Sequence, residues 1–224
     1  MYKSDIITIL TKLAKERKFF WSEADFQFAL AWKIHLLYPK ADIRLERPQK
    51  ISISRNLAYV DIWVELDGKA YPIELKYKTR FYKAKDANGD EIKIKTHSAQ
   101  DTGRHGYLKD IERIEHYRAI NGFERDFAIM LTNDQHYYDK EKKRHDKEKE
   151  RAETNDANFL IHEGATVKGG KTLTWKNPQE WTKKYPDITL CNDYSIHWEK
   201  YNSCDDGNGD FMYTITEIIQ SQSK

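Results

Sequence analysis

The segment Tyr59-Val-Asp-Ile-Trp-Val-Glu-Leu-Asp-Gly-Lys-Ala-Tyr-Pro-Ile-Glu-Leu-Lys76 decides the fold of this chain. Two stretches that are rich in β-branched and aromatic residues flank Asp67-Gly68. An Asp-Gly pair in this setting is the strongest short-range signal for a β-hairpin, and a two-residue turn fixes which residues face each other. The segment therefore predicts an antiparallel hairpin of two strands, 59–66 and 69–78.

The register of this hairpin places Asp61 opposite Glu74, in a non-hydrogen-bonded pair where side chains approach most closely. Two like charges that face each other destabilise a hairpin, and a divalent cation is the natural compensation. Lys76 lies on the same face, two residues along the strand. The opposite face is apolar and is expected to face the core; it carries Val60, Ile62, Val64, Tyr71, Ile73 and Leu75.

The spacing of these charged residues has a counterpart in a known superfamily. Asp61 is followed, after twelve residues, by Glu74-Leu75-Lys76, which resembles the motif of the PD-(D/E)XK nucleases, with Val60 in place of the proline. The resemblance covers roughly residues 20 to 135 in the order of elements. It implies a restriction-endonuclease-like fold, Mg²⁺ bound by Asp61, Glu74 and the backbone carbonyl of Leu75, and a Lys76 that serves the attacking water.

The rest of the chain supplies the elements that such a sheet needs. Helical patterns begin at Ser22, a predicted N-cap, and at Asp101, while the run Phe127-Ala-Ile-Met-Leu-Thr132 reads as a buried strand. We expect one α/β domain over residues 1–224, with a central mixed sheet of four or five strands, helices on both sides and extra C-terminal strands. A charged segment at about 139–158 is interpreted as an insertion or loop.

Composition sets broad limits on function. The 224 residues are 33% charged and 13% aromatic, and the net charge of +2 neither demands nor excludes a nucleic-acid partner. The two cysteines form no CxxC, and the eight histidines show no paired spacing with cysteine, so His105 and His116 are interpreted as surface residues and no zinc site is expected. Without an apolar leader or a membrane-length apolar run, the chain is expected to be cytoplasmic.

Further residues are candidates for the same site. Glu23, at the start of a helix, is expected to be a third metal-linked carboxylate, as in many members of the superfamily; the alternative is that it only complements the helix dipole. Gln100 is a candidate to reach the site, and Lys78, Arg80 and Arg104 are candidates for phosphate contacts. Surface arginines also occur without any such role.

These patterns point to a Mg²⁺-dependent nuclease that hydrolyses phosphodiester bonds, with DNA as the favoured substrate and Mn²⁺ as a substitute ion. Cleavage of both strands would favour a homodimer. The alternative is a non-catalytic module of the same fold that binds nucleic acid or protein. An intact set of Asp61, Glu74 and Lys76 favours the enzyme. Removing either acid is expected to relieve repulsion and to leave the metal-free protein no less stable.

Overall fold

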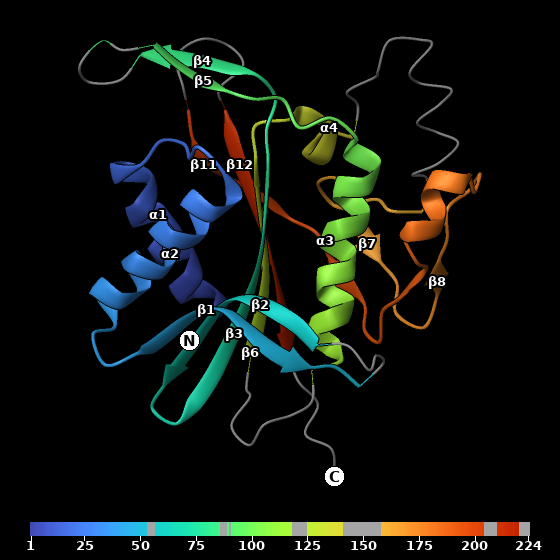
Figure 1. Cartoon of the computed structure of the whole chain (residues 1–224), viewed down its shortest axis with the longest axis horizontal. Helices are drawn as coiled ribbons and strands as arrows, with labels where there is room; N and C mark the ends of the chain where they lie inside the picture. The colour runs from blue at the N-terminus through green and yellow to red at the C-terminus, as the bar shows by residue number, and fades with distance from the viewer. Residues whose placement is uncertain are drawn as a thin grey trace.

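The computed structural model describes residues 1–52, 57–85, 89, 91–117, 125–140, 158–203 and 210–219 (Figure 1). Its centre is a six-stranded sheet in the order β1-β2-β3-β6-β12-β11. β3 and β6 run parallel, whereas the other neighbours in this sheet are antiparallel. The strands are β1 (Asp42–Lys50), β2 (Leu57–Leu66), β3 (Lys69–Lys78), β6 (Arg125–Thr132), β11 (Trp198–Asn202) and β12 (Phe211–Ile219).

Helices cover both faces of this sheet, so the predicted α/β class with a mixed sheet is confirmed (Figure 1). α1 (Lys3–Glu16) and α2 (Glu23–Leu37) pack on one face, and α3 (Gln100–Glu115) packs on the other. The sheet has six strands instead of four or five, because the C-terminal strands join the central sheet through β12–β6 pairing.

The predicted hairpin forms with the predicted register, from Leu66 opposite Lys69 to Ile62 opposite Ile73. Asp67 and Gly68 both have positive φ, 52° and 75°, as a type I′ turn requires. The ladder stops before the pair that would join Asp61 to Glu74, so the expected direct opposition of these two acids is not part of the hairpin.

The predicted apolar face of the hairpin is wrong at one residue. Ile62 packs with α1 and α2, but Val60 packs on the α3 side of the sheet. The cause lies in β1: its ladder with β2 is interrupted at Glu46, whose φ is 51°, between the pairs Leu45–Ile62 and Arg47–Val60. The alternation of side chains in β2 therefore changes at Asp61, opposite this interruption.

Smaller elements lie beyond one end of the sheet and on the outer side of α3 (Figure 1). The β4–β5 hairpin lies beyond one end of the sheet, and its buried residues pack with the α1–α2 side. A C-terminal layer, residues 158–196, packs on the outer side of α3. His105 of α3 is buried against this layer, and its ring stacks on that of Trp175 with the ring centroids 5.4 Å apart. The predicted surface position of His105 is therefore wrong. The elements are β4 (Tyr82–Lys85), β5 (Glu91–Ile94), α4 (Gln135–Tyr138), β7 (Thr166–Val167), β8 (Thr172–Leu173), the 3₁₀ helix η1 (Glu180–Lys184), β9 (Ile188–Thr189) and β10 (Tyr194–Ser195).

Most of the charged segment expected at 139–158 lies outside the described residues, which end at 140 and resume at 158. Cys204 also lies outside them. Among the helices that the structure describes, none combines the length and the apolar character needed to cross a bilayer.

Candidate active site

The site lies where the hairpin opens. β3 pairs with β2 only as far as Ile73, and from Ile73 to Lys78 it pairs with β6 on its other side. Beyond Ile73, none of the described strands pairs with the edge of β3 that faces β2. Backbone N–H groups on such an edge need other acceptors, because a buried unsatisfied donor costs about 1–3 kcal/mol.

Two carboxylates supply these acceptors. Asp61 Oδ2 accepts a hydrogen bond of 2.6 Å from the N–H of Leu75, and Glu23 Oε2 accepts one of 2.7 Å from the N–H of Tyr77. Glu23 reaches this edge from the first turn of α2, whose N-cap Ser22 accepts from the N–H of Asp25. Leu75 and Tyr77 are two residues apart, about 6.6 Å along a strand, so the two acids share an edge but bind separate points on it.

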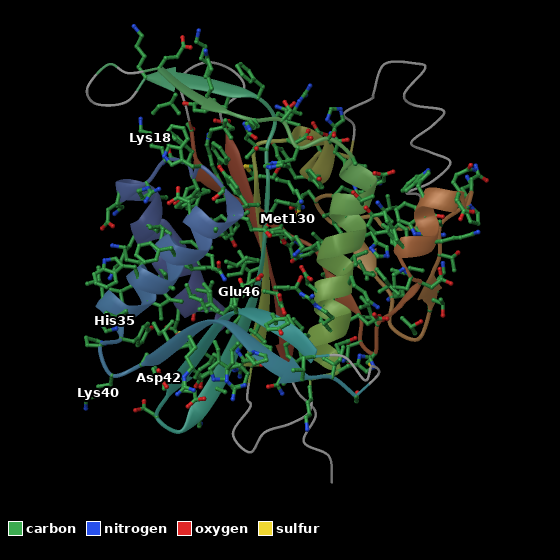
Figure 2. The ribbon with its side chains drawn as sticks, viewed as in Figure 1. Lys18, His35, Lys40, Asp42, Glu46 and Met130 are labelled. Atoms are coloured by element: carbon green, nitrogen blue, oxygen red, sulfur yellow. The ribbon has the colours of Figure 1, made fainter. Side chains whose placement is uncertain are left out.

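Gln27, one helical turn after Glu23, fixes the backbone at Asp61. Its Nε2 donates to the carbonyl of Asp61 and to Oε1 of Glu46, both at 2.7 Å. Glu46 is the residue at which the β1–β2 ladder is interrupted, and it lies between α2 and the sheet (Figure 2). The side chain of Gln27 thus replaces the strand partner that Asp61 lacks at this point.

Glu74 projects toward α3 and is buried, with 1% of its surface exposed. Its Oε2 accepts from Arg113 at 2.8 Å, and its Oε1 accepts from the hydroxyl of Tyr117. Tyr117 is held in turn by an isolated β-bridge to Ile51. The acid therefore has a defined orientation, with one partner on each carboxylate oxygen.

Lys76 completes a chain of charges under α3. Its Nζ lies 2.6 Å from Oδ2 of Asp110 and donates at 3.0 Å to the carbonyl of Leu75. Asp110 also pairs with Arg113 at 2.7 Å, so the order of contacts is Glu74–Arg113–Asp110–Lys76. The face of the hairpin on which the sequence places two acids and a lysine is thus covered by α3.

Asp110, Arg113 and Tyr117 were missed at the sequence level. The helix predicted from Asp101 is recognised by its apolar positions, and the sequence predicts no role for its charged residues. A signal existed: Asp110 and Arg113 are three residues apart, hence on one helical face, and flank the buried Ile111 and Ile114. Acid–arginine pairs at this spacing are common on exposed helices, so the pattern alone does not identify a buried pair.

The charges of this cluster do not balance. Four carboxylates, from Asp61, Glu74, Asp110 and Glu23, and two cations, Lys76 and Arg113, act on one another here, and these six described residues carry a formal charge of −2 when all are ionised. Burial raises the pKa of Asp61 to about 6, with Asp110 and Glu23 adding to the rise and the Leu75 N–H and Lys76 opposing it.

The other two pKa shifts follow from the same imbalance. Burial and the charge of Asp110 raise the pKa of Glu74, although Arg113 opposes this shift. Burial lowers the pKa of Lys76, but Asp110, Glu23 and Asp61 outweigh it and the net shift is upward. Lys76 is therefore an ammonium at neutral pH in this arrangement.

The remaining candidates lie farther along the molecule. Gln100 donates to Asp134 at 2.8 Å, and Arg104 donates to the carbonyl of His136. Gln100 precedes Asp110 by ten residues on α3, which is about 15 Å along a helix, so the structure does not bring it to the acids. Lys78 and Arg80 follow Lys76 at the end of β3, with Arg80 exposed.

Among the described residues of this region, no three acids converge on one point. In the described part of the chain, the one set of at least three Asp, Glu, His or Cys ligand atoms that all lie within 4.8 Å of one another is Glu115, His116 and Cys191. Glu23 therefore anchors the N–H of Tyr77 beside the site instead of converging with Asp61 and Glu74 on one point.

Comparison with known proteins adds no relative to this picture: no family model, no curated protein and no solved structure matches the chain.

Proposed function

We propose that the chain is a Mg²⁺-dependent nuclease that hydrolyses phosphodiester bonds, with DNA as its substrate and Mn²⁺ as a substitute ion. The observation that carries this proposal is the opened edge of β3, where Asp61 binds the N–H of Leu75 while Glu74 and Lys76 project from the same strand. The elements α2, β1, β2, β3, α3 and β6 also follow in the order that the resemblance to PD-(D/E)XK nucleases implies.

The donor set fits a hard divalent cation. Mg²⁺ takes oxygen ligands, typically one or two carboxylates with water and substrate phosphate. Asp61, Glu74 and the carbonyl of Leu75 would hold it, and the formal −2 of the cluster and the raised pKa of Asp61 indicate negative charge that Lys76 and Arg113 do not compensate. The ion would supply stabilisation of phosphoryl charge and a more acidic bound water.

The chain's own residues then orient the reaction. Arg113 and Tyr117 are positioning residues, since they fix the carboxylate of Glu74 from both sides. Lys76, charged and held by Asp110, presents N–H donors beside the Leu75 carbonyl and is placed to orient a water or a phosphoryl oxygen.

Substrate would extend from this site along positive charge. Lys78 and Arg80 continue β3 toward the β4–β5 hairpin, which lies beyond the end of the sheet (Figure 1). Among its described residues this segment exposes the acid Glu91, which pairs with Lys83 and Lys93, and four lysines: Lys83, Lys85, Lys93 and Lys95. Asp86 and Asp90 of the same segment lie outside the described residues. Phosphate contacts of this kind position a nucleic acid without reading its sequence, and cleavage of both strands would require a homodimer or two binding events.

A second function has its own supporting observation. Both oxygens of Glu74 have partners, and the contacts Glu74–Arg113–Asp110–Lys76 join acids to cations without any metal ion. Such a chain would also suit a non-catalytic module of the same fold, which binds nucleic acid or protein and uses these charges only to hold α3 on the sheet.

A cleavage assay separates the two functions. Supercoiled plasmid, end-labelled single-stranded DNA and RNA are incubated with the protein in Mg²⁺, Mn²⁺ or EDTA. We expect metal-dependent cleavage that Lys76→Met lowers at least about 100-fold, the lower range for loss of a donor that stabilises charge in the transition state. Lys33→Met is the control, because Lys33 is also a largely inaccessible lysine with an acidic partner, Glu16 at 2.5 Å, but lies on α2 away from the site; its side chain is 9% exposed, against 19% for Lys76.

The control should cleave like the wild type. Absence of metal-dependent cleavage on all three substrates, together with nucleic-acid or protein binding that ignores EDTA, would favour the non-catalytic module.

A further inference from the structure

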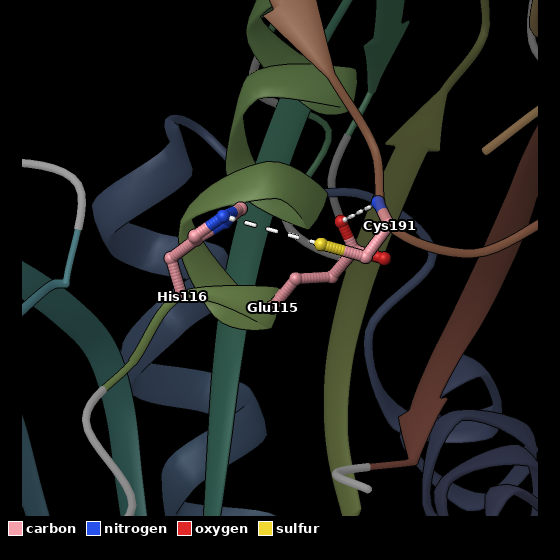
Figure 3. Close-up of side chains that lie close together, drawn as sticks. All are labelled: Glu115, His116 and Cys191. Atoms are coloured by element: carbon pink, nitrogen blue, oxygen red, sulfur yellow. Dashed lines mark hydrogen bonds between the residues drawn. The ribbon is translucent and has the colours of Figure 1, made fainter. Parts of the chain in front are cut away.

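A second cluster of ligand-type side chains joins the end of α3 to the C-terminal layer. Glu115 and His116 end the helix, and Cys191 lies between β9 and β10 (Figure 3). One ligand atom from each residue, namely a carboxylate oxygen, a ring nitrogen and Sγ, lies within 4.8 Å of the other two. Cys191 lies 75 residues after His116 in the sequence, which is why no His–Cys spacing indicates the cluster.

The ring of His116 is oriented for ligation. Its Nδ1 lies 2.8 Å from the carbonyl of Glu112, which can only accept, so the proton sits on Nδ1. In the neutral ring Nε2 then carries the lone pair, and Nε2 is the atom that faces Sγ of Cys191 at 4.0 Å (Figure 3). A backbone carbonyl that fixes the far nitrogen is the usual outer partner of a metal-bound histidine.

The thiol is brought there by contacts of its own segment. Glu115 Oε2 accepts from the N–H of Cys191 at 2.7 Å (Figure 3). Glu115 Oε1 accepts from the N–H and side-chain amide of Asn192 at 3.0 and 3.1 Å, and from the hydroxyl of Tyr194 at 2.8 Å. The loop is thus fixed before any ion binds.

We propose that Glu115, His116 and Cys191 form a binding site for a transition-metal cation of the Zn²⁺ class. A thiolate, an imidazole and a carboxylate suit Zn²⁺ and Co²⁺, whereas Mg²⁺ takes oxygen ligands, so this site is distinct in chemistry from the one at Asp61 and Glu74. Tetrahedral Zn²⁺ bonds of 2.3 Å to sulfur and about 2.05 Å to nitrogen place these atoms about 3.6 Å apart. The site needs to contract by about 0.4 Å between Sγ and Nε2.

The surroundings define what the site would do. Cys191 is exposed, so a fourth position is open to water or an exogenous ligand. The ion would connect the C-terminal layer to the end of α3. His116 directly precedes Tyr117, whose hydroxyl donates a hydrogen bond to Glu74. The proposal itself does not depend on the nuclease function.

Cobalt provides a readout independent of activity. The full-length protein, kept reduced, is titrated with Co²⁺, and we expect one equivalent to produce a near-ultraviolet thiolate-to-cobalt absorption that one equivalent of Zn²⁺ removes. Cys191→Ser should abolish this band, and His116→Gln should weaken binding by more than about 100-fold, because even changes in outer partners cost 10–100-fold in affinity.

Two variants control for adventitious binding. Cys204→Ser replaces the other cysteine of the chain, and His197→Gln replaces an exposed histidine that pairs with Glu163 at 3.2 Å. Both should keep the band and the stoichiometry. A wild type without the band, or a band that survives in Cys191→Ser, would overturn the proposal and leave Cys191 and His116 as a thiol–imidazole hydrogen bond only. Circular dichroism of each variant checks that the fold is retained.

Discussion

The two faces of β3 carry buried residues of opposite chemistry. Leu75 and Tyr77 pack with α1 and α2 and are 0% and 1% exposed. Glu74 projects toward α3 on the other face and is 1% exposed. Burial of the first face stabilises the fold through the hydrophobic effect, and burial of the second removes charge from water at a cost that partners must offset. The apolar face of Leu75 and Tyr77 is what the fold requires. The charged face of Glu74 and Lys76 is not required for folding, and we interpret its formal excess of negative charge as a sign of function.

Breaking the charged face at its centre should have the largest effect. Arg113→Met leaves the carboxylates of Glu74 and Asp110 buried without their shared cation, and we expect a loss of about 3–5 kcal/mol in the free energy of unfolding. Urea denaturation measures it. Arg44→Met, which removes an exposed pair with Asp42, should change stability by less than about 1 kcal/mol. Equal losses for both variants would mean that the network under α3 is not coupled.

Truncation of the apolar face should cost somewhat less and carry no pH signature. Leu75→Ala is expected to lower the free energy of unfolding by about 2–5 kcal/mol, the range for a buried leucine. Because no charge is altered, the loss should be the same at pH 5 and pH 7.5 in urea titrations. A loss that depends strongly on pH would show that the two faces are not energetically separate.

The pH dependence of stability tests Asp61. Its folded-state pKa of about 6 is above the ordinary value, so between about pH 4 and pH 6 the folded protein binds more protons than the unfolded chain, and stability falls as pH rises. Over that window the contribution of Asp61 amounts to at most about 3 kcal/mol. Asp61→Asn keeps an acceptor for the Leu75 N–H, so it should be more stable than the wild type at pH 7.5 and similar at pH 4.

Asp42→Asn, at an exposed acid, is the control and should run parallel to the wild type across the same range. If Asp61→Asn gains nothing at pH 7.5, the carboxylate of Asp61 is compensated in the metal-free protein.

Glu74 is expected to behave differently from Asp61. The sequence predicts that losing either acid leaves the metal-free protein no less stable, but the structure supplies Glu74 with Arg113 and Tyr117 as partners. Glu74→Ala would leave both without an acceptor, and we expect a loss of about 1–3 kcal/mol. Thermal unfolding without metal measures it; a gain in stability would show that repulsion among the acids outweighs these contacts.

The sequence predicted local structure better than it predicted the site. The hairpin could be read because Asp67-Gly68 determines both turn and register within a few residues. The divergence of β2 from β3 could not, because it accompanies the interruption of β1 at Glu46 and contacts from Glu23 and Gln27 on α2, which are distant in sequence. For the same reason the acids were expected face to face, whereas Asp61 binds the N–H of Leu75.

The sequence also provided limited information on side-chain partners that are distant along the chain. Glu23 was expected near the site from its place at a helix start, and the structure brings it to Tyr77 on the same strand. The spacing of Asp110 and Arg113 does not distinguish a buried pair from an exposed one, because their contacts depend on how α3 packs over Glu74.

The central claim, that the charged face of β3 binds a divalent cation, is tested most directly by calorimetric titration of Mg²⁺. The protein carries Cys191→Ser so that the second cluster does not contribute, and it is compared with the same protein carrying Asp61→Asn. We expect one Mg²⁺ per chain at pH 7.5, binding that weakens as pH falls through about 6 because protons compete for Asp61, and at least about tenfold weaker binding in the Asp61→Asn protein. No binding at pH 7.5, or binding that Asp61→Asn leaves unchanged, would contradict the claim.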